Sequence, residues 1–355
     1  MNTNENHCFR LPAEWEPQSG IILIWPHEDT DWRPYLNEIT EVYLQMADAI
    51  TRFEPLLITA RDSEKVHSLL AERLTEGQMK RVTLFACDNN DTWARDVAPI
   101  SLVSDKDPKG SLQALRLLDF CFNGWGEKFA AEKDNRINRQ LYEAGLLQGV
   151  LENHKDFVLE GGSIESDGDR TLFTTTGCLM APHRNQPLTQ EEIDKRLRLF
   201  FPNVERVVWL DYGQLAGDDT DGHIDTIVRV APNHTLLYIG CDDKEDKHYE
   251  DFRLLEEQLK QLRTIDGDPY RLLRLPMPDA IYDDDERLPA THANFLIING
   301  AVLVPTYNQP EKDKVALDTI QEAFPHREII GIDSRTIIRQ HGSIHCLTMQ
   351  LPLNG

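Results

Sequence analysis

The chain has 355 residues, 40% of them hydrophobic, and a formal net charge of −23 at pH 7. The hydrophobic content supports a sizeable core and excludes a disordered chain. The negative charge argues against nucleic acid and anionic membrane surfaces as partners, whereas it is compatible with a cationic substrate.

Predicted strands and helices alternate along the whole chain. Apolar positions at helical spacing predict amphipathic helices, and one of these begins with a capping box formed by Thr189 and Glu192. β-rich runs predict strands, and pairs of runs joined by Gly, Asp, Asn or Pro predict hairpins. In chain order, we expect a strand at 20–25, a helix at 37–53, a strand at 55–59, a helix at 62–74, a strand at 81–86, hairpins at 95–120 and 163–175, a helix at 189–201, a strand at 206–210, a hairpin at 223–239, a helix at 249–262, a strand at 271–275, a hairpin at 294–307, a helix at 311–324 and a strand at 328–332.

The hairpins suggest an internal repeat. Five units can be aligned on a polar residue at the start of the hairpin, with spacings of 64, 63, 71 and 52 residues, at Asp96, Glu160, His223, Asn294 and Cys346. The last unit runs out after Cys346, and residues 20–25 with the helix after them could complete it and close a ring. This regularity favours a radial repeat architecture, with an ordinary alternating α/β fold as the alternative. No linker interrupts the pattern, so we expect a single domain over residues 1–355.

No feature of a membrane or secreted protein is visible. No apolar stretch approaches the ~18 residues that a membrane-spanning helix requires. The polar start "MNTNENHCFRLPAEWEP" lacks the apolar region of a signal peptide. The six cysteines are scattered without a CxxC pair, which favours reduced thiols over disulfides or a zinc ribbon. We therefore expect a cytoplasmic protein.

The stretch "NNDTWARDVAP" places Asp91, Arg95 and Asp96 around Trp93. A carboxylate beside an aromatic ring suits a planar cation, which it can bind by charge-assisted hydrogen bonds with the ring face above. The alternative is a turn capped by an aspartate, with a buried tryptophan. In "LEGGSIESDGD", two glycines follow Glu160 and would let a ligand or another segment approach the backbone closely, although an ordinary glycine-rich turn explains them too.

The stretch "GDDTDGHIDTIVRV" contains His223 and Asp225 two residues apart. On a strand, both side chains would point to one face. Asp and His clusters bind divalent ions, but no HExxH is present and "DDTDG" lacks the closing Glu of a calcium loop. The stretch therefore favours a histidine general acid/base with a neighbouring carboxylate, and a metallohydrolase that uses this loop is the alternative.

Near the end of the chain, "GSIHCLTM" places His345 directly before Cys346. On a strand, these two side chains would point to opposite faces. The histidine that acts with Cys346 should then come from elsewhere, and His223 is the best candidate. A single Cys with a distant His and carboxylate is typical of a thiol nucleophile, while a buried inert thiol is the alternative.

Together these stretches resemble one family. "NDTWARD", "EGGSI", "TDGHID", "HANFLIINGAVLVPTYN" and "GSIHCLTMQ" occur in the order found in agmatine deiminases and bacterial, Porphyromonas-type peptidylarginine deiminases, and the opening "LPAEWEPQSGIILIWPH" is similar as well. The resemblance implies the five-bladed pseudo-symmetric α/β propeller of the guanidine-modifying superfamily (pentein), built from ββαβ-type units. It also implies a site made of a nucleophile at Cys346, a general acid/base at His223, and carboxylates at Asp96, Glu160 and Asp225.

The resemblance further implies a hydrolase acting on a C–N bond of a guanidine. The expected reaction converts agmatine to N-carbamoylputrescine and ammonia, as in putrescine and polyamine metabolism, through a covalent Cys thiouronium intermediate. Asp96, Asp225 and Trp93 would bind the small cationic substrate, and no metal or organic cofactor is needed. Peptidyl-arginine or free arginine as substrate, amidino transfer, and a non-catalytic binding module of the same fold stay open. A homodimer is compatible with the sequence. Met349 and Asp221 depart from the family's usual Gln and Asn, which leaves substrate preference open.

Overall fold

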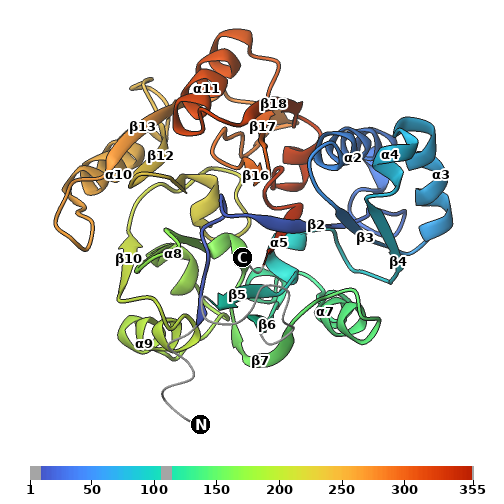
Figure 1. Cartoon of the computed structure of the whole chain (residues 1–355). Helices are drawn as coiled ribbons and strands as arrows, with labels where there is room; N and C mark the ends of the chain where they lie inside the picture. The colour runs from blue at the N-terminus through green and yellow to red at the C-terminus, as the bar shows by residue number, and fades with distance from the viewer. Residues whose placement is uncertain (1–8, 105–113, 354–355) are drawn as a thin grey trace.

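The computed structural model describes residues 9–104 and 114–353 of the chain. Within them the chain is an α/β molecule, with sheets around the centre and helices mostly toward the outside (Figure 1). Strands of the described residues form five sheets of three or four strands and one two-stranded ribbon. None of these sheets is closed on itself.

The first and last parts of the chain share one sheet. Its strand order is β19-β2-β3-β4, and the last strand of the chain runs antiparallel to β2. The prediction that residues 20–25 complete the last unit is therefore confirmed for this pair of strands. The bounds are β2 (Gln18–Ile24), β3 (Leu56–Ala60), β4 (Val82–Ala86) and β19 (Thr348–Pro352).

The other four large sheets repeat one connectivity. Each contains an antiparallel pair of strands and a third strand parallel to the second of that pair, and in one sheet the strand Phe9–Arg10 adds a further antiparallel edge. This agrees with the predicted hairpins; the tip of the hairpin at 95–120 lies outside the described residues. The strands are β1 (Phe9–Arg10), β5 (Ile100–Ser104), β6 (Leu115–Cys121) and β7 (Val150–Val158); β8 (Ile164–Ser166), β9 (Thr171–Thr175) and β10 (Arg206–Leu210); β11 (Val228–Ala231), β12 (Thr235–Gly240) and β13 (Arg271–Pro276); and β16 (Leu296–Ile298), β17 (Ala301–Thr306) and β18 (Glu328–Asp333). The ribbon pairs β14 (Tyr282–Asp283) with β15 (Glu286–Arg287).

The five predicted helices are present with ends within two residues of those expected. They are α2 (Leu36–Thr51), α3 (Ser63–Arg73), α9 (Gln190–Phe200), α10 (Tyr249–Gln261) and α11 (Pro310–Ala323). The predicted capping box of Thr189 and Glu192 starts α9. The sequence did not predict α7 (Asp134–Glu143) or the short helices α4 (Glu76–Met79), α5 (Ala94–Val97), α6 (Gly124–Glu127), α8 (Thr176–Leu179), η1 (Arg33–Tyr35), η3 (Gly161–Ser163), η4 (Ile224–Thr226) and η5 (Ile337–Gln340).

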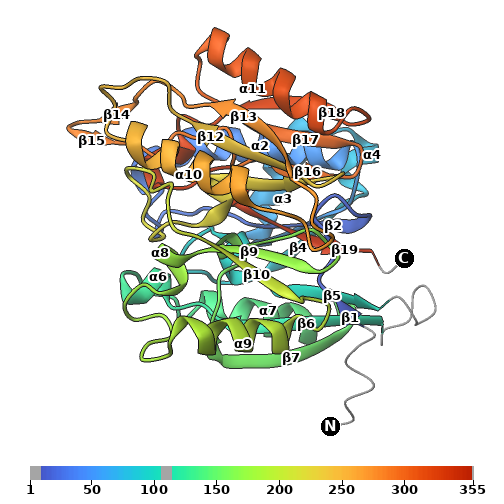
Figure 2. The ribbon, with the colours of Figure 1, turned by 90° about the vertical axis from the view of Figure 1, so that its left-hand side faces the viewer.

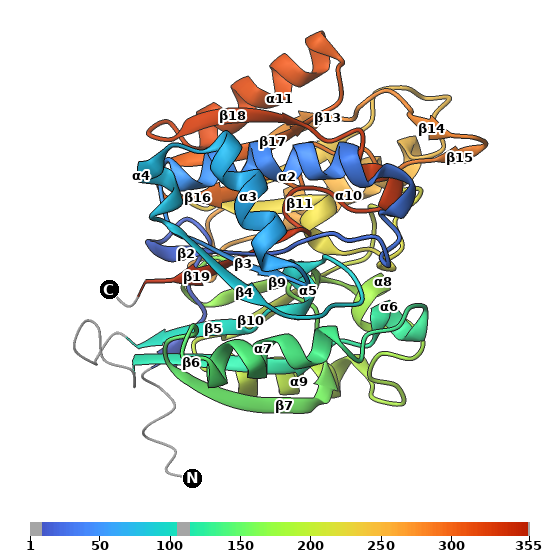
Figure 3. The ribbon, with the colours of Figure 1, turned by 90° about the vertical axis from the view of Figure 1, so that its right-hand side faces the viewer.

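The side views distinguish two ends of the molecule. Loops around α6, α8 and the β14–β15 ribbon lie at one end, while the outer part of β19 lies at the other (Figures 2 and 3). In the part of the chain that the structure describes, no helix combines the length and apolar character that a bilayer span requires.

Two local predictions were wrong. His223 and Asp225 do not share a strand, because His223 precedes the short helix η4 and Asp225 lies within it. The turn before them needs backbone at positive φ, with Asp221 at 65° and Gly222 at 101°, and such backbone does not continue a strand. Cys346 likewise lies in a turn that ends before β19 begins.

Candidate active site

Loops between elements bring the aligned residues of the repeat together. The N–H of Gly162, two residues after Glu160, donates to Asp96 Oδ1 at 3.0 Å. The N–H of Cys346 donates to Asn294 Oδ1 at 3.2 Å. A methyl group at Gly162 would lie 2.6 Å from His223 Nδ1 and 3.1 Å from both Asp225 Oδ2 and Asp96 Oδ1. Only glycine therefore fits where these side chains converge.

Cys346 sits between an amide and a carboxylate. Its side chain is buried, with Sγ 3.3 Å from Asn294 Oδ1 and 4.0 Å from Asp225 Oδ2. Burial, together with the nearby carboxylates of Asp225 and Asp96, raises the pKa of the Cys346 thiol well above its ordinary value. The free protein therefore holds this cysteine as a neutral thiol at pH 7.

His223 is fully buried, and its Nδ1 lies 3.8 Å from Asp96 Oδ1. Neither ring nitrogen has a hydrogen-bond partner among the described residues. Burial lowers the pKa of His223, but Asp96, Cys178 and Glu160 outweigh it and hold this pKa well above the ordinary value. The imidazole is therefore protonated at neutral pH and can donate a proton to a leaving group.

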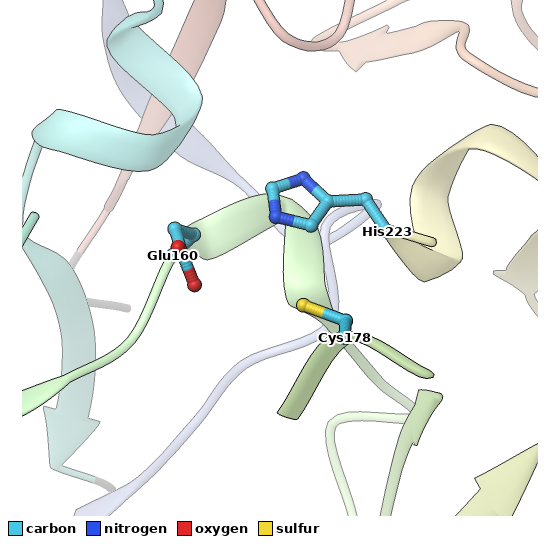
Figure 4. Close-up of side chains that lie close together, drawn as sticks. All are labelled: Glu160, Cys178 and His223. Carbon is cyan, nitrogen blue, oxygen red and sulfur yellow. The ribbon is translucent and has the colours of Figure 1, made fainter. Parts of the chain in front are cut away.

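Glu160 lies beside His223 and Cys178, as Figure 4 shows. Its carboxylate is fully buried; Oε1 accepts from Arg184 Nε at 2.9 Å, while Oε2 has no partner among the described residues. Arg184 also donates to Asp221 Oδ2 and to the Thr220 carbonyl, each at 2.7 Å. One guanidinium thus fixes both Glu160 and the turn before His223.

The two aspartates that were predicted to hold a guanidinium are fixed by hydrogen bonds, on both carboxylate oxygens in Asp96 and on one oxygen in Asp225. Asp96 Oδ2 accepts from Trp125 Nε1 at 3.0 Å. Asp225 Oδ2 lies 2.6 Å from His345 Nδ1, and its Oδ1 is buried with no partner among the described residues. Burial raises the pKa of Asp225, but the lowering by His345 and His223 is larger. The pKa of Asp225 therefore lies below its ordinary value, and Asp225 stays ionised.

A cavity of about 120 Å³ leads to this group. Asp96 and Cys346 line it directly, whereas His223, Glu160 and Asp225 are not among its lining residues. The walls combine aromatic rings with carboxylates and, among the described residues, hold no Lys or Arg; they include Trp93, Trp125, Phe129, Asp31, Asp91, Asp219, Gln340, His341 and Gly342. The lining thus favours a cation that can reach Cys346.

Two groups of side chains have the spacing of metal ligands: Glu160, Cys178 and His223, and Glu14, Glu165 and His345. A guanidinium fills the second group, because Arg229 donates to Glu165 Oε1 at 2.6 Å and to Glu14 Oε2 at 2.7 Å. Its Nη2 also lies 3.1 Å from His345 Nε2. In the first group, Arg184 donates to Glu160 Oε1 at 2.9 Å; burial raises the pKa of the nearby Cys178 thiol, and the charge of Arg184 acts to lower it.

Sequence reasoning missed several residues of the site. Asn294 was aligned by the repeat but given no role, and it contacts Cys346 through both the N–H and Sγ. Trp125, Arg184 and Cys178 gave no recognisable signal, since each comes from a loop or short helix outside the five motifs. Trp93 was expected in substrate binding; it lines the cavity, and its Nε1 donates to Asp91 Oδ2 at 2.9 Å.

Comparison with known proteins adds the family. The family model of Porphyromonas-type peptidyl-arginine deiminase matches residues 10–352. The chain belongs to this family. An agmatine deiminase of Pseudomonas aeruginosa is 32% identical over 367 residues, which cover 97% of this chain and 95% of that protein. The resemblance inferred from the motifs is therefore confirmed.

Solved structures of the deiminase family show the same fold. A Porphyromonas gingivalis protein, described provisionally as an arginine deiminase, has a TM-score of 0.90 and 47% identity, covering 98% of this chain and 99% of that one. C. jejuni agmatine deiminase, solved as a cysteine-to-serine variant with substrate bound, has a TM-score of 0.87 and 35% identity, covering 97% and 96%. The α/β fold of this chain is thus the pentein-type fold of agmatine deiminase structures.

Proposed function

We propose that this protein hydrolyses the guanidine group of agmatine to N-carbamoylputrescine and ammonia. The observation that carries the proposal is the arrangement around Cys346: a thiol at the end of an acidic cavity, with Asp225 4.0 Å from Sγ and a protonated His223 beside Asp96. The names of the P. aeruginosa and C. jejuni relatives support the same substrate.

In the proposed reaction, Asp96 and Asp225 accept hydrogen bonds from the guanidinium nitrogens and place its central carbon near Cys346. The thiol proton leaves to solvent as Sγ adds to that carbon, and the His223 imidazolium donates its proton to the nitrogen that leaves as ammonia and becomes neutral. A thiouronium joined to Cys346 remains. Water then gives a proton to His223 and attacks the carbon, and the C–S bond breaks to release the urea product and restore the thiol.

The roles of the remaining site residues follow from their contacts. A carboxylate oxygen of Glu160 lies within 4.8 Å of a ring nitrogen of His223, and Glu160 orients this ring. Arg184 in turn fixes Glu160. Trp93 and Trp125 are 6.2 Å apart between ring centroids and flank the path to Cys346. The proposed reaction uses no metal or organic cofactor.

The cavity walls favour agmatine over the other guanidines. Agmatine ends in an ammonium group, which suits Asp31, Asp91 and Asp219, and the cavity has no Lys or Arg among its described lining residues to bind the carboxylate of free arginine. Peptidyl-arginine is the second candidate, because the family model carries that name. Amidino transfer and a non-catalytic module are weaker alternatives, since nothing in the cavity walls favours an acceptor amine and every member of the reactive set is present.

The experiment is an ammonia-release assay that compares agmatine, free arginine and an arginyl peptide at equal concentration. We expect agmatine to give the highest kcat/KM, and the Cys346→Ser variant to release no ammonia while folding normally, because a hydroxyl is a far weaker nucleophile. A metal chelator should leave the rate unchanged. Near-normal turnover by Cys346→Ser would contradict the covalent route, and a preference for the peptide would move the assignment to the second candidate.

We also propose that the five large sheets are the blades of one five-bladed α/β propeller over residues 1–355. The repeated connectivity and the pairing of β19 with β2 support this arrangement. The cytoplasm as the location and a homodimer as the assembly remain predictions; sedimentation would test the second.

A further inference from the structure

Glu160, Cys178 and His223 form a compact group of three side chains from different parts of the chain. Glu160 precedes η3, Cys178 lies in α8, and His223 precedes η4. One ligand atom of each lies within 4.8 Å of the others, and all three side chains are fully buried. Figure 4 shows Glu160 to the left of the imidazole ring and the sulfur of Cys178 below it.

Several polar atoms of this group lack partners. Both ring nitrogens of His223 and Oε2 of Glu160 are buried without a hydrogen bond among the described residues. Buried polar atoms of this kind are rare, because leaving one unpaired costs roughly 1–3 kcal/mol. The thiol of Cys178 forms no bond to the substrate in the proposed reaction. The group therefore offers free donor atoms that the deimination mechanism does not fully use.

We propose that Glu160, Cys178 and His223 form a binding site for Zn²⁺, and that occupancy of this site inhibits the enzyme. A thiolate, an imidazole nitrogen and a carboxylate oxygen are the donor types that zinc prefers, and three protein ligands leave one position for water. Mg²⁺ and Ca²⁺ are excluded because both prefer shells made of oxygen atoms. The binding part of the proposal is independent of the proposed function; the inhibition part rests on it.

The surrounding charge supports a cation here. Asp96, with its Oδ1 3.8 Å from His223 Nδ1, adds a second carboxylate, and it lines the cavity through which an ion can enter. The nearest counter-charge is Arg184, which pairs with Glu160 Oε1 and leaves Oε2 free. The other candidate group differs on this point, because the guanidinium of Arg229 already joins Glu14, Glu165 and His345.

Inhibition follows from which atoms the ion would occupy. Binding of Zn²⁺ forms bonds to Cys178 Sγ, a ring nitrogen of His223 and an oxygen of Glu160. The thiol proton of Cys178 and one proton of the His223 imidazolium leave to solvent, so that no electron is transferred and the charge balances. A metal-bound His223 cannot protonate the departing ammonia. Zinc should therefore stop turnover without occupying Asp225 or Cys346.

Cobalt provides a direct readout of binding. Co²⁺ replaces Zn²⁺ in sites of this kind, and a cysteine ligand gives a thiolate-to-cobalt absorption band in the near ultraviolet. The titration uses the Cys346→Ser chain, so that the proposed nucleophile cannot supply the sulfur. We expect the band to appear with one equivalent of Co²⁺ and to be lost in the Cys346→Ser/Cys178→Ala chain. The double variant carrying Cys178→Ser serves as a second test that preserves side-chain size.

A missing band in the Cys346→Ser chain would overturn the site, and so would a band that survives both changes at Cys178. The remaining cysteines are controlled in the same comparison, because Cys8, Cys87, Cys121 and Cys241 are present in every variant. This readout needs no substrate. If the protein does not deiminate agmatine, the cobalt band is still expected. If the metal site is absent, the cobalt band is missing, whatever the ammonia-release assay shows.

Inhibition is measured in the ammonia-release assay, with each variant compared with its own metal-free rate. We expect the zinc concentration for half-inhibition to rise at least about tenfold in Cys178→Ala relative to the unchanged chain, since loss of one ligand commonly weakens metal binding by about 10- to 100-fold or more. A chain without Cys178 that stays equally sensitive would show that zinc acts elsewhere, most simply at Cys346, and would overturn the inhibitory role.

Discussion

At the scale of single residues, the site separates a neutral thiol from a charged imidazole. Burial and the carboxylates of Asp225 and Asp96 raise the pKa of Cys346, while Asp96, Cys178 and Glu160 raise that of His223 over the opposing effect of burial. A cysteine protease places its thiolate and imidazolium in a standing ion pair; here the free protein keeps the proton on sulfur. A bound guanidinium neutralises the two aspartates and so favours the thiolate that attacks it.

This state of Cys346 can be tested by alkylation of the free protein with neutral iodoacetamide over a pH series, followed by peptide mass spectrometry. We expect Cys346 to react slowly at pH 7 and faster only well above about pH 8.5, the ordinary pKa of a thiol. Asp225→Asn removes one of the two carboxylates and should shift the reaction toward lower pH. Fast alkylation of Cys346 from about pH 6 upward would show a standing ion pair instead.

His223 gives a second prediction at this scale. His223→Asn should lower kcat for agmatine by about 10²- to 10⁴-fold, the usual contribution of a general acid/base. Because hydrolysis of the thiouronium also needs this group, a covalent adduct on Cys346 should accumulate and be visible by intact-protein mass spectrometry. Wild-type kcat in this variant would contradict the role.

His345 is a poor choice of control histidine for that experiment, although it has no assigned role in the reaction. Its Nδ1 lies 2.6 Å from Asp225 Oδ2 and its Nε2 2.7 Å from Glu14 Oε2. A His345→Ala change would therefore release Asp225 and also lower activity, but by weakening substrate binding. His67 on α3, away from the site, is the better control.

The sequence allowed Asp96, Glu160, His223 and Cys346 to be predicted, because each stands at the same place in a repeated unit, and Asp225 followed from its position two residues after His223. Cys178 and Arg184 could not be found this way. Both reach the site from the segment after β9, and their role depends on how α8 and the following turn pack against His223 and Glu160. Contacts of that kind are created by the tertiary fold and leave no periodic trace in the sequence.

At the scale of elements, turns and short helices carry the site, while the strands hold those segments in place. The hairpins could be predicted from their turn residues, as with β11 and β12 around the "APNH" turn. The strand expected at His223 could not form, because the positive φ of Asp221 and Gly222 turns the chain into η4. The alternating polarity of "HIDTIV" predicted a strand, but the turn at Gly222 directs residues 224–226 into a short helix instead.

Gly342 shows how close such a segment comes to the cavity. A methyl group at this position would lie 2.1 Å from Cζ3 of Trp93, and both residues line the cavity. Overpacking of this kind costs about 1–3 kcal/mol. If Gly342→Ala moves the Trp93 ring, we expect kcat/KM for agmatine to fall by about 5- to 150-fold, mainly through a higher KM.

The matched control is Gly77→Ala in α4, where the nearest atom to the added methyl group is Thr75 Oγ1 at 3.9 Å. This change should leave the kinetics unaltered, because Gly77 lies in ordinary helix far from the cavity walls. Unchanged kinetics in Gly342→Ala as well would show that substrate does not depend on the position of Trp93.

At the scale of the whole molecule, Arg229 joins segments that lie far apart in the sequence. Its fully buried side chain extends from β11, pairs with Glu165 of β8 and with Glu14, and donates to the carbonyls of Ala293 and Phe295. The sequence pattern predicted the separate units but gave no sign of this centre. "VRVA" shows one charged residue in an apolar strand, and only the assembled fold identifies its partners.

The last prediction concerns this buried centre. Arg229→Met leaves Glu14 and Glu165 without their guanidinium, and removing one partner of a buried ion pair commonly costs about 3–5 kcal/mol. We expect the urea midpoint, followed by circular dichroism, to fall accordingly, whereas Arg271→Met, which loses an exposed pair with Glu322, should cost at most about 1 kcal/mol.

The pH dependence of this loss has a definite sign. Burial raises the pKa of Glu14, but the lowering by His345 and Arg229 is larger, so that its pKa in the folded protein lies well below the ordinary value. A carboxylate of depressed pKa stabilises the fold above about pH 4.3, its ordinary pKa, and loses that contribution as the pH falls. The deficit of Arg229→Met should therefore be full at pH 7 and shrink below about pH 4. If Arg229→Met loses the same free energy of unfolding at pH 7 and below about pH 4, lost packing, and not the ion pair with Glu14, explains the destabilisation.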